Sequence, residues 1–167
     1  PSFKVEKHLK VYALSDSNAP EDPNSPEYET FISNLLTQIK DYKHVLVLFT
    51  NLDVIREVFS RLSENSNVLK DYEILAQGLT GSNEKIAKRF GIAEKAILLG
   101  ANSFWEGIDF KHNGVDLAIV TRLPFESPDQ PEVKLRTECL KKQVGADKIF
   151  EVDTLPRAIL RFRQGCG

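Results

Sequence analysis

The sequence has few of the residues that mark membrane-spanning, disulfide-rich or metal-binding proteins. None of its apolar runs approaches the roughly 20 residues that a membrane helix requires. It has only two cysteines, Cys139 and Cys166, and its three histidines are scattered, so no metal-ligand spacing is present. These features predict a cytoplasmic protein with reduced thiols, no bound metal of its own and no membrane partner.

The sequence also lacks a large excess of either positive or negative charge. The chain has 22 Lys and Arg residues against 24 Asp and Glu residues, a net charge of −2. This balance argues against holding nucleic acid by bulk positive charge, but it permits local contacts to a strand. With 167 residues, 41% of them apolar and 28% charged, the chain fits one globular domain. Because it starts at Pro1 rather than Met, we expect a piece of a longer protein.

Several motifs of nucleotide and ester chemistry are missing. The chain contains no G-x-x-x-x-G-K-[ST] loop, no G-x-G-x-x-G and no G-x-S-x-G. Without the first of these, the chain has no loop that could cradle a triphosphate by itself.

The apolar pattern predicts alternating strands and helices. Strand-like runs occupy residues 9–15, 45–49, 72–76, 96–99, 117–120 and 150–152. Helical patterns follow residue 25, residue 51, residue 82, residue 131 and residue 156. We therefore predict an α/β fold in which a mostly parallel sheet lies under helices on both faces.

Local signals predict where the helices begin and end. Ser25 before Pro26 is a typical N-cap and first turn, and Ser82 is placed to cap the helix that follows it. Thr50 and Asp53 have capping-box spacing. Gly91 is placed to end the helix that starts after Ser82.

Polar groups follow three of the predicted strands. They are Thr50 and Asn51 after the first buried run, residues 101–109 after another, and Arg122 after a third. In an open parallel sheet, ligands bind beyond the carboxyl ends of the strands. The three segments therefore predict one shared functional surface.

Taken singly, these residues have other interpretations. Thr50 and Asn51 also suit a simple helix cap, and the single tryptophan, Trp105, also suits a core position. Glu106 and Asp109 fit either solvated loop acids or a carboxylate pair for acid–base chemistry.

Four segments in series carry a resemblance to a known family. VLVLFTN (45–51) is similar to helicase motif IV, and GANSFWEGIDF (100–110) is similar to motif V. RLPFESPDQP (122–131) resembles the family's L-P-F-x-x-P-x-x-P segment, and LPRAILRFRQGCG (155–167) resembles the start of motif VI. Together they resemble the second RecA-like domain of the DinG/XPD branch of superfamily 2 DNA helicases, specifically its DinG-like members.

The resemblance implies a three-layer α/β/α RecA-like fold and a single domain, residues 1–167, that is the C-terminal lobe of a longer protein. ATP is held between two such lobes, so the N-terminal RecA-like domain of the same chain is an implied partner, and it would also hold the Mg²⁺. In this reading, the residues facing the nucleotide are Glu106, Gly107, Asp109, Gln164 and Gly167.

The same resemblance implies contacts with single-stranded DNA. The residues it assigns to DNA are Thr50, Asn51, Ser103, Phe104 and Trp105. Hydroxyls, amides and helix N-terminal N–H groups can bind phosphates without a net positive charge, and they read little base sequence.

The sequence ends at Gly167, before the motif VI arginines of the family. Such arginines stabilise transition-state charge and contribute about 10³-fold or more in rate. Arg161 and Arg163 lie one turn earlier and are not substitutes. We therefore expect no complete catalytic set, and no ATP hydrolysis by this segment alone.

Two alternatives to a helicase motor remain. One is a helicase-like domain that grips DNA or regulates an exonuclease–helicase fusion without unwinding. The other is an unrelated hydrolase using Glu106 and Asp109, which leaves the other three segments unexplained. An iron–sulfur cluster, which usually needs four ligands, would have to lie elsewhere, because this chain has two cysteines.

Overall fold

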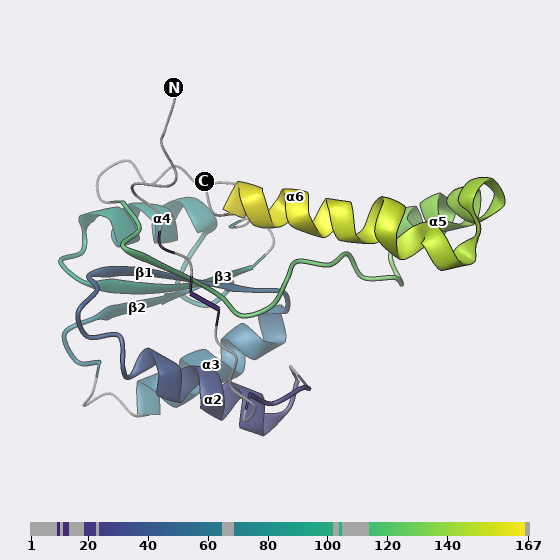
Figure 1. Ribbon diagram of the computed structural model, residues 1–167. Helices are drawn as coiled ribbons and strands as arrows, with labels where there is room; N and C mark the ends of the chain where they lie inside the picture. The colour runs from purple at the N-terminus through teal and green to yellow at the C-terminus, as the bar shows by residue number, and fades with distance from the viewer. Residues whose placement is uncertain are drawn as a thin grey trace.

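The strands of the computed structural model form one parallel sheet (Figure 1). The structure describes residues 10, 12–13, 19–22, 24–64, 69–101, 104 and 114–165. Within these residues the sheet order is β2-β3-β1-β4, and every pairing is parallel. The strands are β1 (His44–Phe49), β2 (Glu73–Ala76), β3 (Ala96–Ala101) and β4 (Leu117–Val120). This arrangement is consistent with a RecA-like fold and confirms the predicted fold class.

The two central strands are the most apolar ones. All six residues of β1 and all six of β3 are buried, as expected for parallel strands covered on both faces. They pair in register from His44 opposite Ala96 to Phe49 opposite Ala101. Their carboxyl ends therefore lie level with one another at one edge of the sheet.

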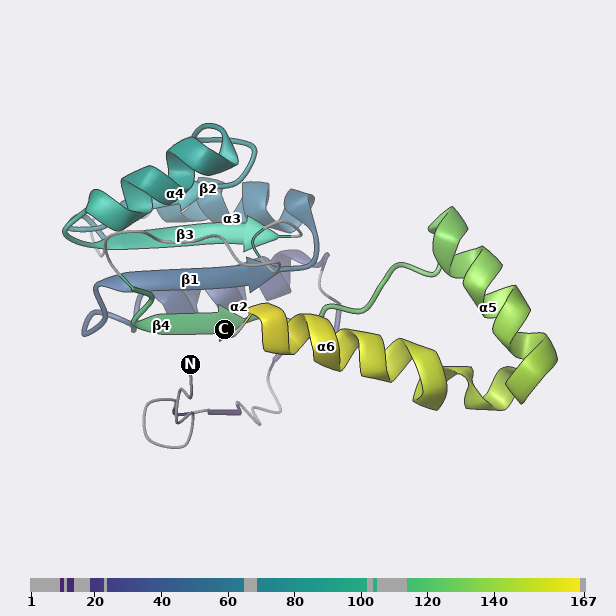
Figure 2. The same ribbon diagram turned by 90° about the horizontal axis from the view of Figure 1, so that it is seen from above.

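Helices cover both faces of the sheet (Figures 1 and 2). Helices α2 (Pro26–Leu36) and α3 (Leu52–Glu64) lie on one face, where the larger apolar cluster sits. The buried Glu29 of α2 accepts hydrogen bonds from Arg61 of α3, with the shorter N–O distance 3.0 Å. Helix α4 (Asn83–Ile92) and the end of α6 (Leu155–Gly165) cover the other face.

Two of the predicted helix starts are confirmed. Ser25 Oγ accepts the Tyr28 N–H at 3.1 Å, and Ser82 Oγ accepts the Lys85 N–H at 3.4 Å.

Two other predicted helix boundaries are wrong. Helix α3 is capped by Asn51, whose Oδ1 accepts the Asp53 N–H at 2.9 Å, rather than by a Thr50–Asp53 capping box. Gly91 does not end α4, because it is buried inside the last turn and extended backbone at Ala93 terminates the helix.

The predicted strand at residues 150–152 is also wrong. Phe150–Thr154 forms a single π-helical turn, η3, that runs directly into α6. The helical turn lets Asp153 bond to arginines of two helices, which an edge strand would not do. The strand predicted at residues 9–15 falls largely outside the described residues, and residues 10, 12 and 13 carry no regular structure.

The C-terminal helices form an arm, which we define as residues 131–165. It consists of α5 (Pro131–Val144), the short 3₁₀ turn η2 (Ala146–Lys148), η3 and α6. Figures 1 and 2 show that the arm projects past the carboxyl ends of the strands, and that α6 returns from it towards the sheet. Helix α5 has no buried residue, which agrees with its position away from the sheet.

Candidate functional site

The ends of β1, β3 and β4 meet at one edge of the sheet. Phe49, the last residue of β1, pairs with Ala101, the last of β3, and Leu48 pairs with Val120, the last of β4. The strand ends from which the three predicted polar segments start therefore lie beside one another at this edge. Most of the segment after Ala101 lies outside the described residues, so the shared functional surface stays a prediction.

A small hollow lies beyond β1 and β4 on this edge. Its polar lining residues are Thr50, Asn51, Thr121 and Arg122, with Tyr28, Phe49 and Val54 supplying apolar surface. Thr50 and Arg122 are exposed, whereas Asn51 is half-buried. The hollow is small and its accessible lining is mostly apolar. The exposed groups at its rim are the Thr50 hydroxyl and the Arg122 side chain, which are of the kinds that bind phosphates.

Hydrogen bonds fix the walls of this hollow. Thr121 Oγ1 donates to the Leu48 carbonyl at 2.9 Å, and Tyr28 Oη donates to the Thr121 carbonyl at 3.1 Å. Asn51 Nδ2 donates to Asn24 Oδ1 at 3.0 Å, while Arg122 donates to the carbonyl of Glu21. Asn51 is therefore engaged on both sides, as a helix cap and as a partner of Asn24.

The exit of β3 is held by a close contact between Gly100 and Phe104. A Cβ atom built on Gly100 would lie 2.7 Å from Phe104 Cγ, too close for any larger residue to fit without a shift. The Phe104 side chain is only 3% exposed and belongs to the apolar cluster beneath α4. The side chain is occupied in packing, so a contact of residue 104 with DNA would fall to its main chain, and the assignment stays a prediction.

Most residues assigned to nucleotide binding lie outside the described residues. This applies to Glu106, Gly107, Asp109 and Gly167, and also to Ser103 and Trp105 on the DNA side. Their roles stay predictions.

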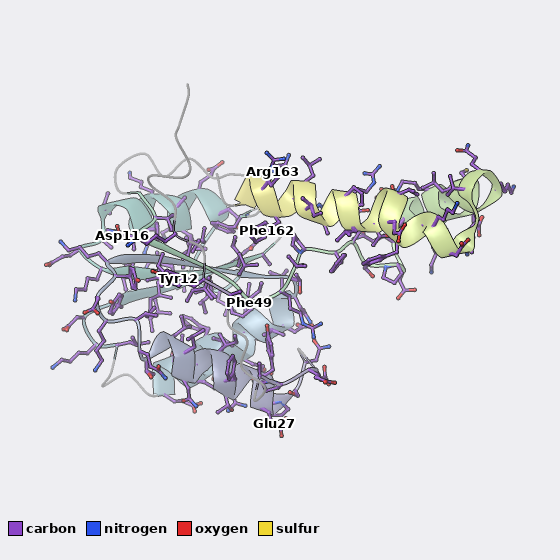
Figure 3. The ribbon with its side chains drawn as sticks, viewed as in Figure 1. Tyr12, Glu27, Phe49, Asp116, Phe162 and Arg163 are labelled. Atoms are coloured by element: carbon purple, nitrogen blue, oxygen red, sulfur yellow. The ribbon has the colours of Figure 1, made fainter. Side chains whose placement is uncertain are left out.

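Gln164 is described and lies at the exposed end of α6. Two residues before it, Phe162 packs against the same apolar cluster that contains Phe104. Figure 3 shows Phe162 directed towards the sheet and Arg163 directed away from it. One residue of each of the motif-like segments 100–110 and 155–167, Phe104 and Phe162, thus belongs to or packs against the same cluster, although the segments are far apart in sequence.

A network of ion pairs ties the arm to the segment after β4. Arg136 of α5 donates through Nε to Asp153 Oδ2 at 2.9 Å and through a terminal nitrogen to Glu126. Arg157 donates to Asp153 Oδ1 at 2.7 Å, and Arg161 lies 3.4 Å from Glu126 Oε1. Arg161 thus joins α6 to the segment after β4, and its exclusion as an arginine finger stays a prediction.

Asp153 accepts hydrogen bonds from two arginines of the network, Arg136 and Arg157. Burial of its carboxyl group would raise its pKa, but the hydrogen bonds and charges of Arg157 and Arg136 outweigh burial and hold the pKa below its ordinary value. The hydrogen bond to Asp153 correspondingly raises the pKa of Arg136. Asp153 and Arg136 therefore both favour their charged forms in the folded protein.

A second hollow lies at the opposite, amino-terminal edge of the sheet. It is lined by Lys43, His44, Ala93, Glu94, Gly114 and Asp116. Its Asp116 carboxylate accepts the main-chain N–H groups of Lys43 and His44, at 3.1 and 3.0 Å. These bonds join β1 to the start of β4, which gives the acid a structural role.

Sequence reasoning missed Gln77, the residue after β2. Its side-chain oxygen accepts the Ala101 N–H at 2.7 Å, at the point where β3 ends. The available signal was its position, since it is a polar residue that directly follows an apolar strand, as Thr50 does.

Among the described residues, no three His, Cys, Asp or Glu side chains gather as a metal site would require. Nor is any helix in that part of the chain long and apolar enough to cross a membrane.

Comparison with known proteins places the chain in a family. A family model described as helicase C-terminal domain matches residues 32–167. The 3′-5′ exonuclease DinG of Bacillus subtilis (strain 168) is 33% identical over 168 residues, and that of Staphylococcus aureus (strain USA300) is 31% identical over 171 residues. Each alignment covers 99% of this chain but only 18% of the relative.

Proposed function

This chain belongs to the helicase C-terminal domain family, as a DinG-like member, and we propose that it is the second motor lobe of an ATP-dependent enzyme acting on DNA. In this proposal the carboxyl edge of the sheet completes an ATP cleft whose other wall is an N-terminal RecA-like domain of the same polypeptide. That domain supplies the triphosphate loop and Mg²⁺, and the working protein is cytoplasmic.

The observation that carries the proposal is the convergence of motif-like segments on one edge. The segments that start at Thr50 and after Ala101 leave adjacent strands. Phe162, near the end of α6, packs against the apolar cluster that also contains Phe104 of the second segment. Two neighbouring ligand sites on one edge allow the same loop to contact nucleotide on one side and a DNA strand on the other.

The proposed mechanism is closure of a cleft. Gly107 and Asp109 face the nucleotide, and the Asp109 carboxylate accepts a hydrogen bond from a ribose hydroxyl. Glu106 helps to orient the loop. Gln164 and Gly167 approach the nucleotide from the motif VI side. ATP favours the closed state and hydrolysis releases it, which suffices for stepping along a strand. Arginines beyond Gly167 would complete the catalytic set.

DNA contacts in this proposal are to the backbone of a single strand. Thr50 is exposed at the mouth of the hollow, and Arg122 lies on the same rim. Hydroxyl and main-chain donors from Thr50, Asn51 and Ser103 would bind phosphates, while Trp105 would buttress the loop. Such contacts position a strand but carry no base information, so sequence preference should be low.

A second candidate is a domain that binds DNA without unwinding it. Both relatives carry the name 3′-5′ exonuclease, and this chain aligns with only 18% of each. In that case the lobe holds a strand for a nuclease or regulates it, without coupling to ATP.

The two candidates differ in ATP hydrolysis by the longer polypeptide. We expect hydrolysis that single-stranded DNA stimulates, and none from residues 1–167 alone. If DNA binds but does not stimulate ATP hydrolysis, the result would favour the domain that binds DNA without unwinding it. Turnover by the isolated 167-residue chain, rising in proportion to its concentration, would contradict the two-lobe proposal.

A further inference from the structure

Gln77 continues the pairing of β2 with β3 after the main chain of β2 has turned away. Its N–H donates to the Leu99 carbonyl at 3.0 Å, as a strand residue would. In a regular parallel ladder, the carbonyl of residue 77 would next accept the N–H of residue 101. The Gln77 side chain takes that place, because its Oε1 accepts the Ala101 N–H at 2.7 Å.

The turn after Gln77 explains this replacement. Gly78 has φ of +78°, which redirects the chain in the left-handed region that glycine tolerates. Thr80 closes the turn: its N–H donates to the Ala76 carbonyl at 3.0 Å, and its Oγ1 accepts the Ala76 N–H at 3.0 Å. The main chain of β2 is thus held away from β3, and the half-buried Gln77 side chain reaches back to it.

Ala101 is fixed from both sides as a result. On one side it pairs with Phe49 of β1, and on the other it bonds to Gln77. One residue earlier, Gly100 lies against the buried ring of Phe104. These contacts set the direction in which the chain leaves β3.

We propose that Gln77 is a positioning residue for the segment 100–110. The inference rests on the proposed function, in which this segment contacts both nucleotide and DNA. Gln77 itself touches neither ligand in this account. It acts through Ala101, because the direction of a loop follows from the last strand residues that are held, and small misplacements of a binding group weaken a site strongly.

The test compares Gln77→Met and Gln77→Glu in the longer polypeptide. Methionine keeps the unbranched length but lacks the amide oxygen, whereas glutamate keeps an oxygen able to accept the Ala101 N–H. Gln143→Met, on the exposed face of α5, is the matched control. The readouts are KM and kcat for DNA-stimulated ATP hydrolysis, together with hydrogen exchange in residues 100–104 and 44–49.

We expect Gln77→Met to raise the KM for ATP by about fivefold, the equivalent of one lost hydrogen bond. Exchange should become faster in residues 100–104 and stay unchanged in residues 44–49 of β1. Gln77→Glu, which keeps the acceptor but adds a charge, should raise the KM less than Gln77→Met does, and Gln143→Met should change nothing. A loss of folded protein would lower the apparent kcat without raising KM, so the rise in KM identifies positioning.

Three results would overturn the inference. They are an unchanged KM in Gln77→Met, equal impairment of the Met and Glu variants, and a fall in kcat alone. If the wild-type polypeptide hydrolyses no ATP, the proposed function fails instead. Hydrogen exchange then still decides whether Gln77 holds the exit of β3. Faster exchange in residues 100–104 of Gln77→Met supports this role, and unchanged exchange refutes it.

Discussion

The ring of Phe104 lies directly against Gly100, in the space that a side chain at residue 100 would need. A Cβ atom on Gly100 would be 2.7 Å from Phe104 Cγ and 2.9 Å from Phe104 Cβ. Since Phe104 is 3% exposed and packed in the core, it cannot move aside easily. The glycine therefore permits the chain to fold back on β3 immediately after leaving it.

Gly100→Ala should therefore destabilise the fold. Overpacking at this position should lower the free energy of unfolding by about 1 to 3 kcal/mol. Gly114→Ala is the control, because no atom of the described part of the chain lies within 4 Å of a Cβ at residue 114. Urea unfolding of the two variants measures the difference, and equal stability of both would refute the close contact.

Arg136→Met should also destabilise the fold, by removing the centre of the network on the arm. Asp153 and Glu126 would lose a shared partner while remaining largely buried, with side-chain exposures of 10% and 16%. We expect a loss of about 2 kcal/mol. Lys134→Met, two residues away, removes an exposed pair with Asp129 and should cost less than about 0.5 kcal/mol. Similar losses in both variants would mean that the network contributes no more than a surface pair.

Asp153 should contribute a pH-dependent part of the stability. Its pKa is lowered in the folded state, so its contribution is fully present above the unfolded pKa of about 3.9 and is lost as pH falls through the folded value. Wild-type protein should therefore exceed Asp153→Asn in free energy of unfolding at pH 7. The difference should shrink as the pH falls below about 4. A difference independent of pH would contradict this assignment.

Thr50→Val should weaken binding to single-stranded DNA without affecting stability. The Thr50 side chain is exposed at the mouth of the hollow, and valine preserves its shape while removing the hydroxyl. Loss of one hydrogen bond to phosphate should raise the Kd by about fivefold. Fluorescence anisotropy with a labelled oligonucleotide measures this effect in the longer polypeptide. Unchanged affinity would remove Thr50 from the DNA contact.

The sequence predicted those parts of the molecule that follow from local rules. The continuous apolar runs at 45–49 and 96–99 identified β1 and β3, because strands covered on both faces need apolar residues at every position. Ser25 and Ser82 capped helices as predicted, since their bonds reach only three residues along the chain.

Features that depend on distant partners could not be predicted in this way. Residues 150–152 alternate as an edge strand does, yet their helical turn is accompanied by bonds from Asp153 to Arg136 and Arg157, on α5 and α6. The burial of Phe104 depends on Gly100 and on the cluster beneath α4. Gln77 likewise acquires its importance from Ala101, 24 positions away. Such contacts become visible only when the strands are brought together.

The central claim is that the segment 100–110 couples DNA to ATP, and the most direct test is DNA-stimulated ATP hydrolysis by Asp109→Ala in the longer polypeptide. Asp129→Ala serves as control, because its carboxylate is 88% exposed in a surface pair. We predict that DNA stimulation collapses in Asp109→Ala while Asp129→Ala keeps the wild-type value. Full stimulation in Asp109→Ala would contradict this claim and leave the segment without a place at the nucleotide.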